Sequence, residues 1–437
     1  MLALCISLCL AGCSRQAPAE PASTEPASTE PPVTEAVTQP AETEAPTAAP
    51  AFESFDRSRE ISPSLLLDSP DLRITADQLQ YGEQEVLLVL RVENRRDTYL
   101  TLSPELQAGT MLAVNGSWIP CQGEFFRAAP GETVTYHLPI PYEEMELRGI
   151  TALGELEFCL EGDGISTGFL SVSTGKDSAS FLETAAAPSE ALGWKPLWLG
   201  DRSFYERSGI RHRGTAIVET SEGERMLSLD FENTSADVKI LSLGEFGLNG
   251  LHLPIGGQTA LLLPGCHSQF FLDLTALEKT HRLSDLGMDM PGSLELLAAL
   301  YDRNMKPVFA PLALSLILSE EPAELPLPET LLYEEEKLQV YYGGAFREED
   351  GALTLSLIYD SRYQEGFLVQ AMELTREGEK LPFSMPSLSF TGRGRGLLSI
   401  SLPAEIAADL TGGSLTLKTL EQPGRTRTVR SYSLPLA

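Results

Sequence analysis

The chain has 437 residues and a formal net charge of −30 at pH 7. This charge argues against binding to nucleic acid or to an anionic lipid surface, because both need basic patches that neutralise phosphate. The length beyond residue 52 allows about two to four domains with hydrophobic cores. Since no apolar run reaches about 18 residues, the sequence predicts no membrane-spanning helix.

The chain begins with a short apolar leader that ends in Leu10-Ala11-Gly12-Cys13. This stretch resembles the lipobox of bacterial lipoproteins, in which an apolar residue and two small residues precede a lipid-modified cysteine. The resemblance implies that residues 1–12 are a signal peptide and that Cys13 carries a lipid. The rest of the chain would then lie on the extracellular side of the cell membrane, at the cell surface, held by the lipid alone. A buried N-terminal strand ending in Gly-Cys is the alternative.

The leader departs from the usual pattern because it contains no Lys or Arg. Signal peptides usually run for about 15–30 residues and begin with a basic region. We therefore expect the true start codon to lie upstream of Met1. An in-frame start followed by basic residues would support the lipoprotein interpretation, and its absence from the genome would weaken it.

A linker follows, because residues 13–52 consist almost wholly of Ala, Pro, Thr, Ser and Glu and include the tandem pentapeptides 20–24 and 25–29. This composition predicts disorder, since too little apolar surface is available to offset the entropy of ordering. Prolines and repelling glutamates favour an extended spacer of up to ~3.1 Å per residue. The linker resembles the spacers of surface lipoproteins in Gram-positive bacteria.

Three cysteines follow the leader and Cys13, namely Cys121, Cys159 and Cys266. An odd number without a Cys-x-x-Cys pair predicts neither a disulfide framework nor a zinc site. A bridge between Cys121 and Cys159 is one interpretation. Buried free thiols are the favoured one.

The remainder reads as short β-strands separated by turns, with apolar or alternating runs at 86–92, 227–231, 312–318 and 353–357. Such runs, broken by Pro-Gly, Asn-Gly and Gly-Gly steps, are typical of antiparallel strands. Short helical turns are expected at 274–283 and 403–410. The sequence therefore predicts an all-β protein.

An internal repeat is indicated by landmarks that recur in the same order. Three of them recur with a spacing of 134 residues, namely Asn115-Gly116 and Asn249-Gly250, Pro130-Gly131 and Pro264-Gly265, and Leu138 and Leu272. Two further pairs flank these at similar spacing, Asn94 with Asn233 and Gly154 with Gly292. Asn-Gly supplies the positive φ angles of a tight hairpin, and Pro-Gly suits a type II turn.

A weaker third copy lies 128 residues beyond the second, with Leu227 matched by Leu355 and Leu272 by Ile400. This copy has lost the Asn-Gly and Pro-Gly turns. At the Pro-Gly position it carries residues 391–396, where we expect a longer, glycine-rich and basic loop.

These patterns predict three tandem antiparallel β-sandwich domains at 60–176, 200–319 and 330–437, after the disordered N-terminal linker. The stretch 319–330 reads as a stiff acidic connector. Such units resemble the immunoglobulin-like modules of many bacterial surface lipoproteins, a likeness at the level of fold that does not assign a function.

Catalytic motifs are not predicted. The stretch 164–168 fits Gly-x-Ser-x-Gly, but it lies between strands rather than between a strand and a helix, so Ser166 reads as part of a hairpin turn. The histidines lack metal-ligand spacing, with His137 read as an exposed strand residue and 211–213 as a solvated turn. The acidic clusters 143–144 and 334–336 lack a calcium-binding loop pattern. We expect no catalytic residue, metal or cofactor.

A few side chains are candidates for ligand contact. Trp118, Trp194 and Trp198 could stack on sugar rings or anchor a peptide, although packing between the first two units is the favoured interpretation. Arg393 and Arg395 could clamp an anion, although a solvated loop is favoured.

Two functions remain open on the sequence alone. The favoured one is a non-enzymatic surface lipoprotein whose sandwich units form a binding or spacer array for a protein, a cell-wall polymer or a glycan. The alternative is a cell-envelope hydrolase that acts on polysaccharide through carboxylates distant in sequence.

Lipid attachment predicts a simple change of fractionation. Replacing Cys13 by Ala removes the acceptor thiol, so the variant is expected in the soluble fraction without lipid label, whereas the parent chain stays with the membrane. Membrane association that survives the substitution would contradict lipidation at this residue.

Overall fold

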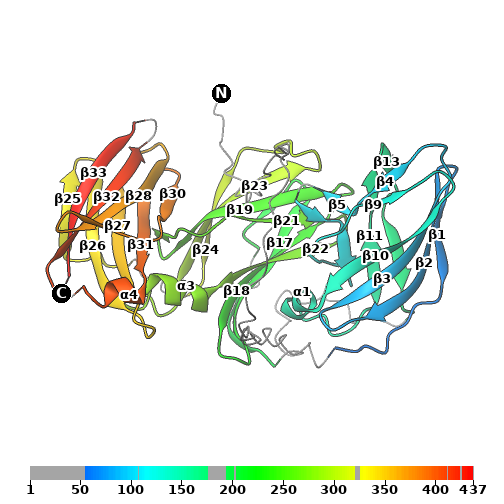
Figure 1. Ribbon diagram of the computed structural model, residues 1–437, viewed down its shortest axis with the longest axis horizontal. Coiled ribbons are helices and arrows are strands. Elements are labelled where there is room, and N and C mark those ends of the chain that lie inside the picture. Colours follow the sequence, from blue (N-terminus) through cyan, green and yellow to red (C-terminus); the bar gives the residue numbers. More distant parts are fainter. Residues whose placement is uncertain are drawn as a thin grey trace, which may run out of the picture. The chain divides into compact units, whose positions relative to one another are not determined.

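The computed structural model describes residues 55–106, 108–175, 193–200, 203–319, 325–410, 412–423 and 426–436. Cys13, the leader and the linker 13–52 lie outside these residues. The described part is all-β, with a few short helices, as the sequence predicted (Figure 1). None of its helices is long and apolar enough to cross a membrane. We refer to residues 55–175, 193–319 and 325–436 as the first, second and third segments.

The first segment folds as two facing antiparallel sheets. Its strands are β1 (Ser64–Asp68), β2 (Leu72–Tyr81), β3 (Glu85–Asn94), β4 (Leu100–Leu102), β5 (Glu105–Leu106), β6 (Gly109–Thr110), β7 (Leu112–Val114), β8 (Ser117–Trp118), β9 (Phe126–Ala128), β10 (Thr133–Pro141), β11 (Glu155–Phe158), β12 (Glu161–Gly162), β13 (Ile165–Ser166) and β14 (Leu170–Ser173), with helix α1 (Tyr142–Leu147) after β10. One sheet has the order β1-β2-β3-β10, and the other contains β14-β11-β7-β8. Buried aliphatic residues from both sheets form one hydrophobic cluster. Apolar and polar residues alternate along these strands, which places the apolar side chains on the face toward the cluster. In β10 the side chains of Tyr136, Leu138 and Ile140 face the cluster, whereas Thr135 and His137 are exposed.

The second segment repeats the two-sheet arrangement. Its elements are β15 (Lys195–Gly200), β16 (Glu206–Arg207), β17 (Ile210–Glu219), β18 (Arg225–Asn233), β19 (Lys239–Leu248), β20 (Leu251–His252), β21 (Gln258–Leu262), β22 (His267–Asp273), α3 (Leu274–His281), β23 (Ser293–Asp302) and β24 (Leu312–Ile317). β15 pairs with β17, so this segment starts before the expected residue 200. His212, expected in a solvated turn, is instead buried on β17 against the ring of Phe204.

The third segment has the same order of elements. They are β25 (Thr330–Glu335), β26 (Leu338–Arg347), β27 (Leu353–Ser361), β28 (Phe367–Arg376), β29 (Glu379–Leu381), β30 (Ser387–Phe390), β31 (Gly394–Leu402), α4 (Ala404–Ala407), β32 (Ser414–Pro423) and β33 (Thr428–Pro435). Its two sheets contain β31-β27-β26-β25 and β29-β28-β32-β33. The longer loop expected at 391–396 is not formed, because β31 already begins at Gly394.

Two sheets continue from one segment into the next. β8 of the first segment pairs in parallel with β22 of the second, and β20 of the second pairs in parallel with β31 of the third. Each junction therefore joins two four-stranded sheets edge to edge. The largest hydrophobic cluster also crosses both junctions, since it includes Trp118 from the first segment and Leu397 from the third. By their contacts residues 50–437 form one compact unit.

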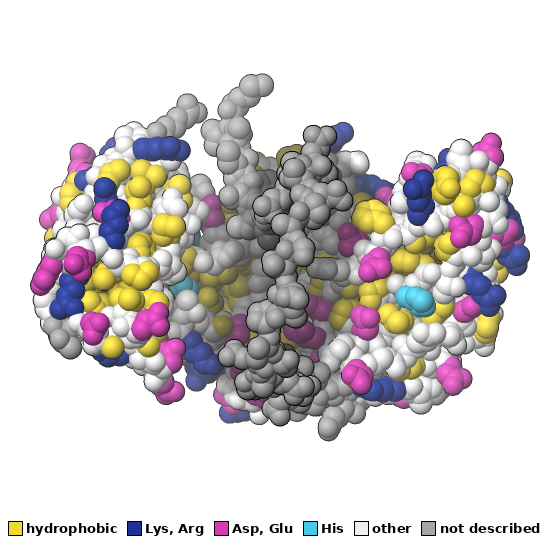
Figure 2. Space-filling view, viewed as in Figure 1, with side chains coloured by type: hydrophobic (Ala, Val, Ile, Leu, Met, Phe, Trp, Pro, Cys, Tyr) yellow, Lys and Arg dark blue, Asp and Glu magenta, His cyan; other side chains and the backbone are white. Residues whose placement is uncertain are grey.

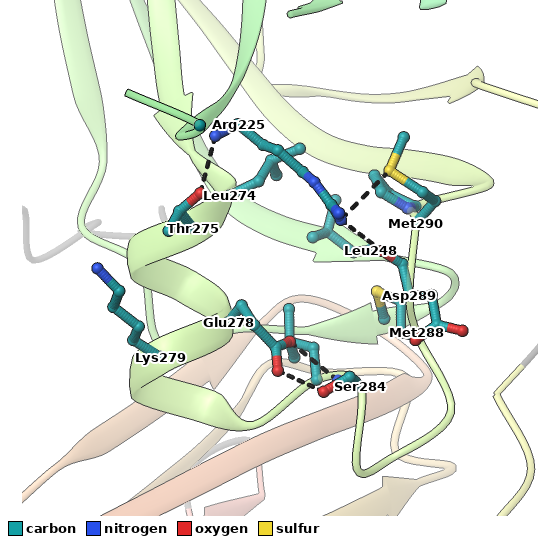
Figure 3. A pocket seen from close by; sticks show the side chains of 13 residues that line it. Arg225, Leu248, Leu274, Thr275, Glu278, Lys279, Ser284, Met288, Asp289 and Met290 are labelled. Carbon is teal, nitrogen blue, oxygen red and sulfur yellow. Dashed lines mark hydrogen bonds between the residues drawn. The ribbon is translucent and has the colours of Figure 1, made fainter. Parts of the chain in front are cut away.

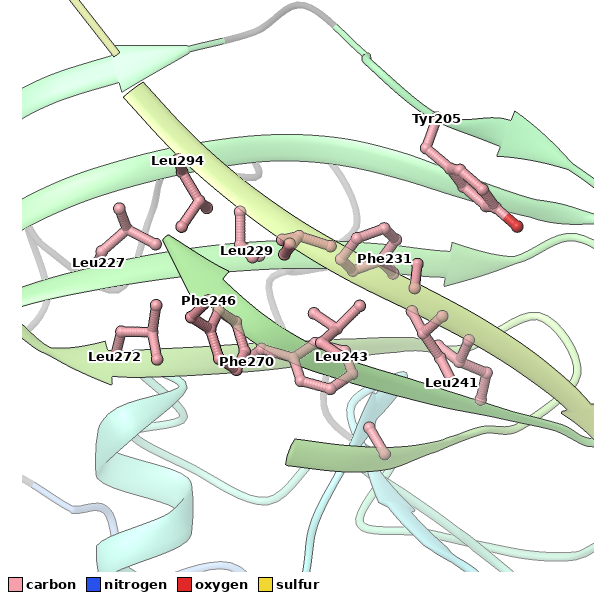
Figure 4. Close-up of a cluster of buried hydrophobic side chains, with 14 of the residues drawn as sticks. Tyr205, Leu227, Leu229, Phe231, Leu241, Leu243, Phe246, Phe270, Leu272 and Leu294 are labelled. Atoms are coloured by element: carbon pink, nitrogen blue, oxygen red, sulfur yellow. The ribbon is translucent and has the colours of Figure 1, made fainter. Parts of the chain in front are cut away.

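The core of the second segment shows what this packing contributes (Figure 4). Phe231 and Phe270 meet edge to face with ring centroids 5.7 Å apart, and Phe246 and Leu229 are buried with them. Full burial of each such side chain stabilises the fold by about 1.5–3 kcal/mol. These residues come from β18, β19 and β22, so the cluster holds both sheets of the segment together.

The Asn-Gly landmarks form the turns of hairpins, as predicted. Asn249 and Gly250 have φ angles of 50° and 73°, and Asn115 and Gly116 have 51° and 77°. Positive φ at both central residues is the geometry of a type I′ turn. The Asn249 carboxamide oxygen also accepts hydrogen bonds from the backbone N–H groups of Gly292 (2.6 Å) and Ser293 (2.9 Å). The Asn115 carboxamide oxygen accepts the equivalent bonds from the backbone N–H groups of Gly154 (2.9 Å) and Glu155 (3.1 Å).

The third copy keeps this turn with a different residue, so the prediction that the turn is lost was wrong. Glu377 and Gly378 have φ angles of 51° and 89°. The three hairpins share a pattern of Gly, two variable residues, Ile or Leu, and Pro, which ends at Ile119-Pro120, Leu253-Pro254 and Leu381-Pro382. Because glutamate replaces the asparagine, the third turn lacks the Asn-Gly dipeptide by which the other two are recognised in the sequence.

The Glu-Asn landmarks place a buried asparagine at the end of β3 and of β18. Asn233 donates hydrogen bonds to the carbonyl oxygens of Asp237 (2.8 Å) and Leu262 (2.7 Å) and accepts one from the Ser235 N–H (2.9 Å). Asn94 makes the equivalent bonds in the first segment. Both side chains are fully buried, so these hydrogen bonds take the place of bonds to water. They also fix the conformation of the loop that follows each strand.

This arrangement predicts a large effect of one substitution. Asn233→Ala leaves buried backbone groups without partners and is expected to lower the free energy of unfolding by about 2–4 kcal/mol. Urea unfolding measures this loss. The matched control is Asn304→Ala, which alters an exposed turn; equal stability of the two variants would contradict the role assigned to Asn233.

Candidate functional site

A groove with a volume of about 560 Å³ lies on the second segment (Figure 3). Its floor is aliphatic and its rim carries charges of both signs. The lining residues are Gly223, Arg225, Leu248, Leu274, Thr275, Glu278, Lys279, Leu283, Ser284, Met288, Asp289, Met290 and Pro291. They come from helix α3, the ends of β18 and β19, and the loop that leads to β23.

Helix α3 forms one wall of the groove. Its N-cap is Asp273, whose carboxylate accepts a hydrogen bond from the Ala276 N–H (2.8 Å). The helix ends at Arg282, which has a φ angle of 55° and turns the chain back. Glu278 then accepts hydrogen bonds from both the N–H (2.9 Å) and the hydroxyl (2.5 Å) of Ser284. The helix and the loop after it are thereby held together.

Arg225 closes the opposite wall. Its backbone N–H donates to the Thr275 hydroxyl (2.7 Å), and its guanidinium donates to the carbonyl oxygen of Asp289 (3.2 Å) and lies 3.8 Å from the sulfur of Met290. In Figure 3 the Arg225 side chain extends across the top of the groove toward Met290. Arg225 therefore fixes the loop that carries both methionines.

The lining residues favour binding of an apolar group over catalysis. Leu248, Leu274, Leu283 and Met288 are buried in the floor, and the exposed Met290 offers a flexible, polarizable side chain that can adapt to a partner. The lining contains no aromatic residue, histidine or cysteine. A site of this kind binds an aliphatic or aromatic side chain while the rim charges contact polar groups around it.

The tryptophans proposed for ligand contact do not meet at this groove. Trp118 is buried at the first junction in a cluster with residues of the second segment, and its indole N–H donates to the Thr110 carbonyl oxygen (2.8 Å). It is therefore not exposed for ligand contact, and packing between the first two units was the interpretation favoured from the sequence. Trp198 is half-buried on β15 and lies over Gly200, where an added Cβ would clash with its ring. Trp194 is half-buried just before β15.

The two arginines do not form an anion clamp. Arg393 is exposed in the turn before β31. Arg395 is half-buried on β31 and donates to the carbonyl oxygen of Leu325 (2.9 Å), which ties the start of the third segment to the second junction. Arg395 therefore has a structural contact that the sequence pattern does not indicate.

A second cavity, of about 530 Å³, lies at the first junction and includes Ser166 and Cys159. Ser166 belongs to the β12–β13 hairpin, as predicted, and its hydroxyl donates to Glu161 (2.9 Å) rather than to a histidine. Burial raises the pKa of the Cys159 thiol. Glu161 also pairs with Arg303 across the junction. The cavity thus holds no activated nucleophile.

The three described cysteines are free, so Cys121 and Cys159 do not form a bridge. Burial raises the pKa of the Cys121 thiol to about 11 and that of Cys266 further. At neutral pH these thiols are protonated and act as small apolar side chains.

Ser117, His267 and Asp230 meet at the first junction, a combination that no sequence motif indicates. His267 Nδ1 lies 2.9 Å from an Asp230 carboxylate oxygen, and Ser117 is the register partner of His267. However, all three side chains are at most 2% exposed, and neither the Ser117 hydroxyl nor His267 Nε2 makes a hydrogen bond within the described chain. A nucleophile must be bonded to its base and reach substrate, so we assign this group to the junction.

Glu335 and Glu421 form a carboxylate pair in the third segment, joined by Arg430, which donates to both at 3.1 and 2.8 Å. Burial raises the pKa of Glu421. The pKa of Glu335 is lowered, since hydrogen bonds from Tyr333 and Tyr363 and the charge of Arg430 outweigh its desolvation. Opposite shifts are what an acid and base pair needs. Glu421 is nevertheless fully buried, and neither carboxylate lines the cavities described, so the group ties the two sheets together.

The surface gives no sign of a metal or polyanion site in the part of the chain that the structure describes. No three or more His, Cys, Asp or Glu side chains gather there in a metal-binding arrangement. On the face shown in Figure 2, acidic, basic and hydrophobic side chains are interspersed. On this face the acidic side chains are therefore spread out rather than gathered in one patch.

Comparisons with known proteins do not assign a family. No protein-family description and no curated protein matches the sequence. A 1.5-MDa bacterial ice-binding adhesin, studied for its retention at the host cell surface, is 10% identical over 80% of this chain and 90% of that chain, with a TM-score of 0.14. Dimeric latent PorU from Porphyromonas gingivalis is 8% identical over 87% of this chain and 32% of that chain, with a TM-score of 0.16. Backbones with such scores do not superpose, so the function is argued from this chain alone.

The buried imidazoles predict stability that depends on pH. Burial lowers the pKa of both His212 and His281 to about 4, whereas an unfolded histidine titrates near about 6.5. As the pH falls, these histidines take up protons in the unfolded chain before they do so in the folded chain. Their contribution to the free energy of unfolding is therefore constant above about pH 6.5 and decreases as the pH drops toward about 4.

We expect His281→Gln to recover about 1–2 kcal/mol of the loss in unfolding free energy between about pH 7 and pH 5. Urea unfolding at the two pH values measures it. An unchanged loss in the variant would show that His281 does not carry this dependence.

Proposed function

We propose that this protein is a non-enzymatic, lipid-anchored protein of the cell surface that binds a protein ligand through the groove of the second segment. The groove itself carries this proposal. It combines an apolar floor, the exposed Met290 at its edge and a rim with charges of both signs. These are the features of sites that receive an apolar anchor side chain from a partner protein.

A protein ligand fits this groove better than a glycan does. Sugar rings are bound by stacking on exposed aromatic faces, and the groove has no aromatic lining. Trp118 is buried, so its ring is not available to stack on a sugar. Leucine and methionine side chains instead complement apolar residues, and Arg225 and Lys279 at the rim suit carbonyl oxygens or carboxylates beside them.

The anchored location is a separate part of the proposal. It is supported by the lipobox-like stretch 10–13 and by the Pro/Thr/Glu-rich composition of 13–52. A lipid on Cys13 would hold the chain at the membrane, and an extended linker would carry the β-segments away from it.

The hydrolase alternative has less support. The Glu335–Glu421 pair has opposite pKa shifts, but a glycosidase needs both carboxyl groups to line a cleft that admits the sugar. Glu421 is enclosed by Arg430, Tyr432 and Thr419 instead.

The proposal predicts a peptide preference that depends on one exposed methionine. Displayed peptide libraries should enrich sequences with a Leu, Met or Phe anchor, and Met290→Glu should weaken binding of the selected peptides at least tenfold. Met290 is 39% exposed, so the change places a charge at the groove without opening the core.

The matched control is Ile317→Glu, which adds the same charge at an exposed position of β24 outside the groove. Fluorescence anisotropy with the full chain measures both variants. Equal weakening by the two substitutions, or enrichment of oligosaccharides instead of peptides on mixed arrays, would overturn the proposal.

A further inference from the structure

A hairpin with a type I′ turn followed by Ile-Pro or Leu-Pro occurs once in each described segment, and we call these three copies docking hairpins. They consist of β7 and β8, β19 and β20, and β28 and β29. In the first two, the returning strand also pairs with the next segment. In the third copy, the returning strand β29 makes no such pairing among the described strands.

The first junction defines the contact. Ser117 of β8 is in register with His267 of β22, and the His267 N–H donates to the Gly116 carbonyl oxygen (2.9 Å). Trp118 then packs into the core that both segments share. β21, which lies beside β22, also contacts β6 and β8 of the first segment. The acceptor therefore consists of a strand edge and the strand next to it.

The second junction repeats the contact in the same register. Leu251 lies opposite Arg395, and His252 lies opposite Gly396. The His252 ring stacks on Phe390 with centroids 4.9 Å apart and planes parallel to within 1°. Leu251 follows Ser117 by 134 residues, and Arg395 follows His267 by 128, the two spacings of the repeat. The contact is thus a property of the repeat.

The third docking hairpin leaves its outer edge open. Among the described strands, β29 pairs only with β28. Beside it is a hollow of about 390 Å³ whose lining includes Glu379 and Leu381. Two large apolar side chains of the same sheet region are exposed, Met372 on β28 at 44% and Met385 just before β30 at 64%. An unpaired edge flanked by apolar side chains is a site for strand addition.

The first segment carries the matching acceptor, also open. β10 occupies the place that β22 and β31 take in the other segments, and among the described strands it pairs only with β3. Its outward residues Thr133, Thr135 and His137 are exposed. The adjacent β9 is preceded by Phe125, which is 71% exposed. Among the described strands, the third segment therefore offers the hairpin and the first segment offers the acceptor.

We propose that a second copy of this chain docks head to tail, with β29 of one copy paired in parallel with β10 of the next. If the contact between copies has the same register as the two internal junctions, Glu379 lies opposite Thr133 and Lys380 lies opposite Val134. Such a contact uses two different surfaces, so it leads to chains of copies rather than to a closed symmetric dimer. Phe125 of one copy and the exposed methionines of the other supply the apolar anchors, since methionine sulfur packs well on aromatic rings.

The contact between copies is weaker than the internal ones for an identifiable reason. Lys380 stands where Trp118 and His252 contribute buried rings, and it is exposed and paired with Glu373. A charged edge residue limits indiscriminate strand pairing. Association is therefore expected at high protein concentration, as when copies share one surface.

Site-specific cross-linking tests the register. Two full-length variants, Glu379→Cys and Thr133→Cys, are mixed in a background with Ser at Cys5, Cys9 and Cys13, and glutathione disulfide serves as the oxidant. It is reduced to two glutathione molecules as the two engineered thiols form the disulfide. The control acceptor is Ser64→Cys, on β1 at the opposite edge of the same sheet.

The proposal predicts at least tenfold more heterodimer with Thr133→Cys than with Ser64→Cys, and none with the parent chain. Equal yields, no cross-link, or a stronger Glu379→Cys homodimer would overturn it. Sedimentation of the chain without engineered cysteines provides a second measurement. Mass should rise with concentration and the rise should be lost in Phe125→Ser, whereas a monomer at every concentration would refute the proposal.

Discussion

The structure depends on backbone pairing at the edges of the docking hairpins. Two short strands, β8 and β20, each join a sheet of one segment to a sheet of the next. An unpaired edge would leave N–H and C=O groups without partners, and pairing satisfies them while it aligns the hydrophobic clusters on either side. Because this hydrophobic cluster includes residues of all three segments, each junction is packed as well as hydrogen-bonded.

The candidate groove depends on the same element. Leu248, part of its floor, is the last residue of β19, and Asn249 at the following turn holds Gly292 and Ser293 at the end of the loop that carries Met288 and Met290. The turn that presents β20 to the third segment therefore also shapes the site of the second. A change at this turn would affect assembly of the sheets and the groove together.

Several polar groups resemble catalytic sites yet serve packing. His267 with Asp230 lies in the first junction, and Glu421 with Arg430 lies between the sheets of the third segment. Both groups are buried, which is costly for charged side chains unless they are paired and hydrogen-bonded. These buried pairs help to specify which strands pack against each other. Residue types alone do not separate such pairs from catalytic ones, because the difference is access to substrate.

The sequence by itself determined the all-β class, the type I′ turns at Asn115 and Asn249 and the short helix after β22, because alternation, positive φ and capping are local properties. Its pattern also contained the third hairpin at Glu377-Gly378. Only the tertiary structure decided that Trp118 is buried, that Arg395 bonds to Leu325 and that the groove forms beside α3. These outcomes depend on which strand edges pair between residues more than a hundred positions apart, and such pairing follows from the packing of whole sheets rather than from any local run of residues.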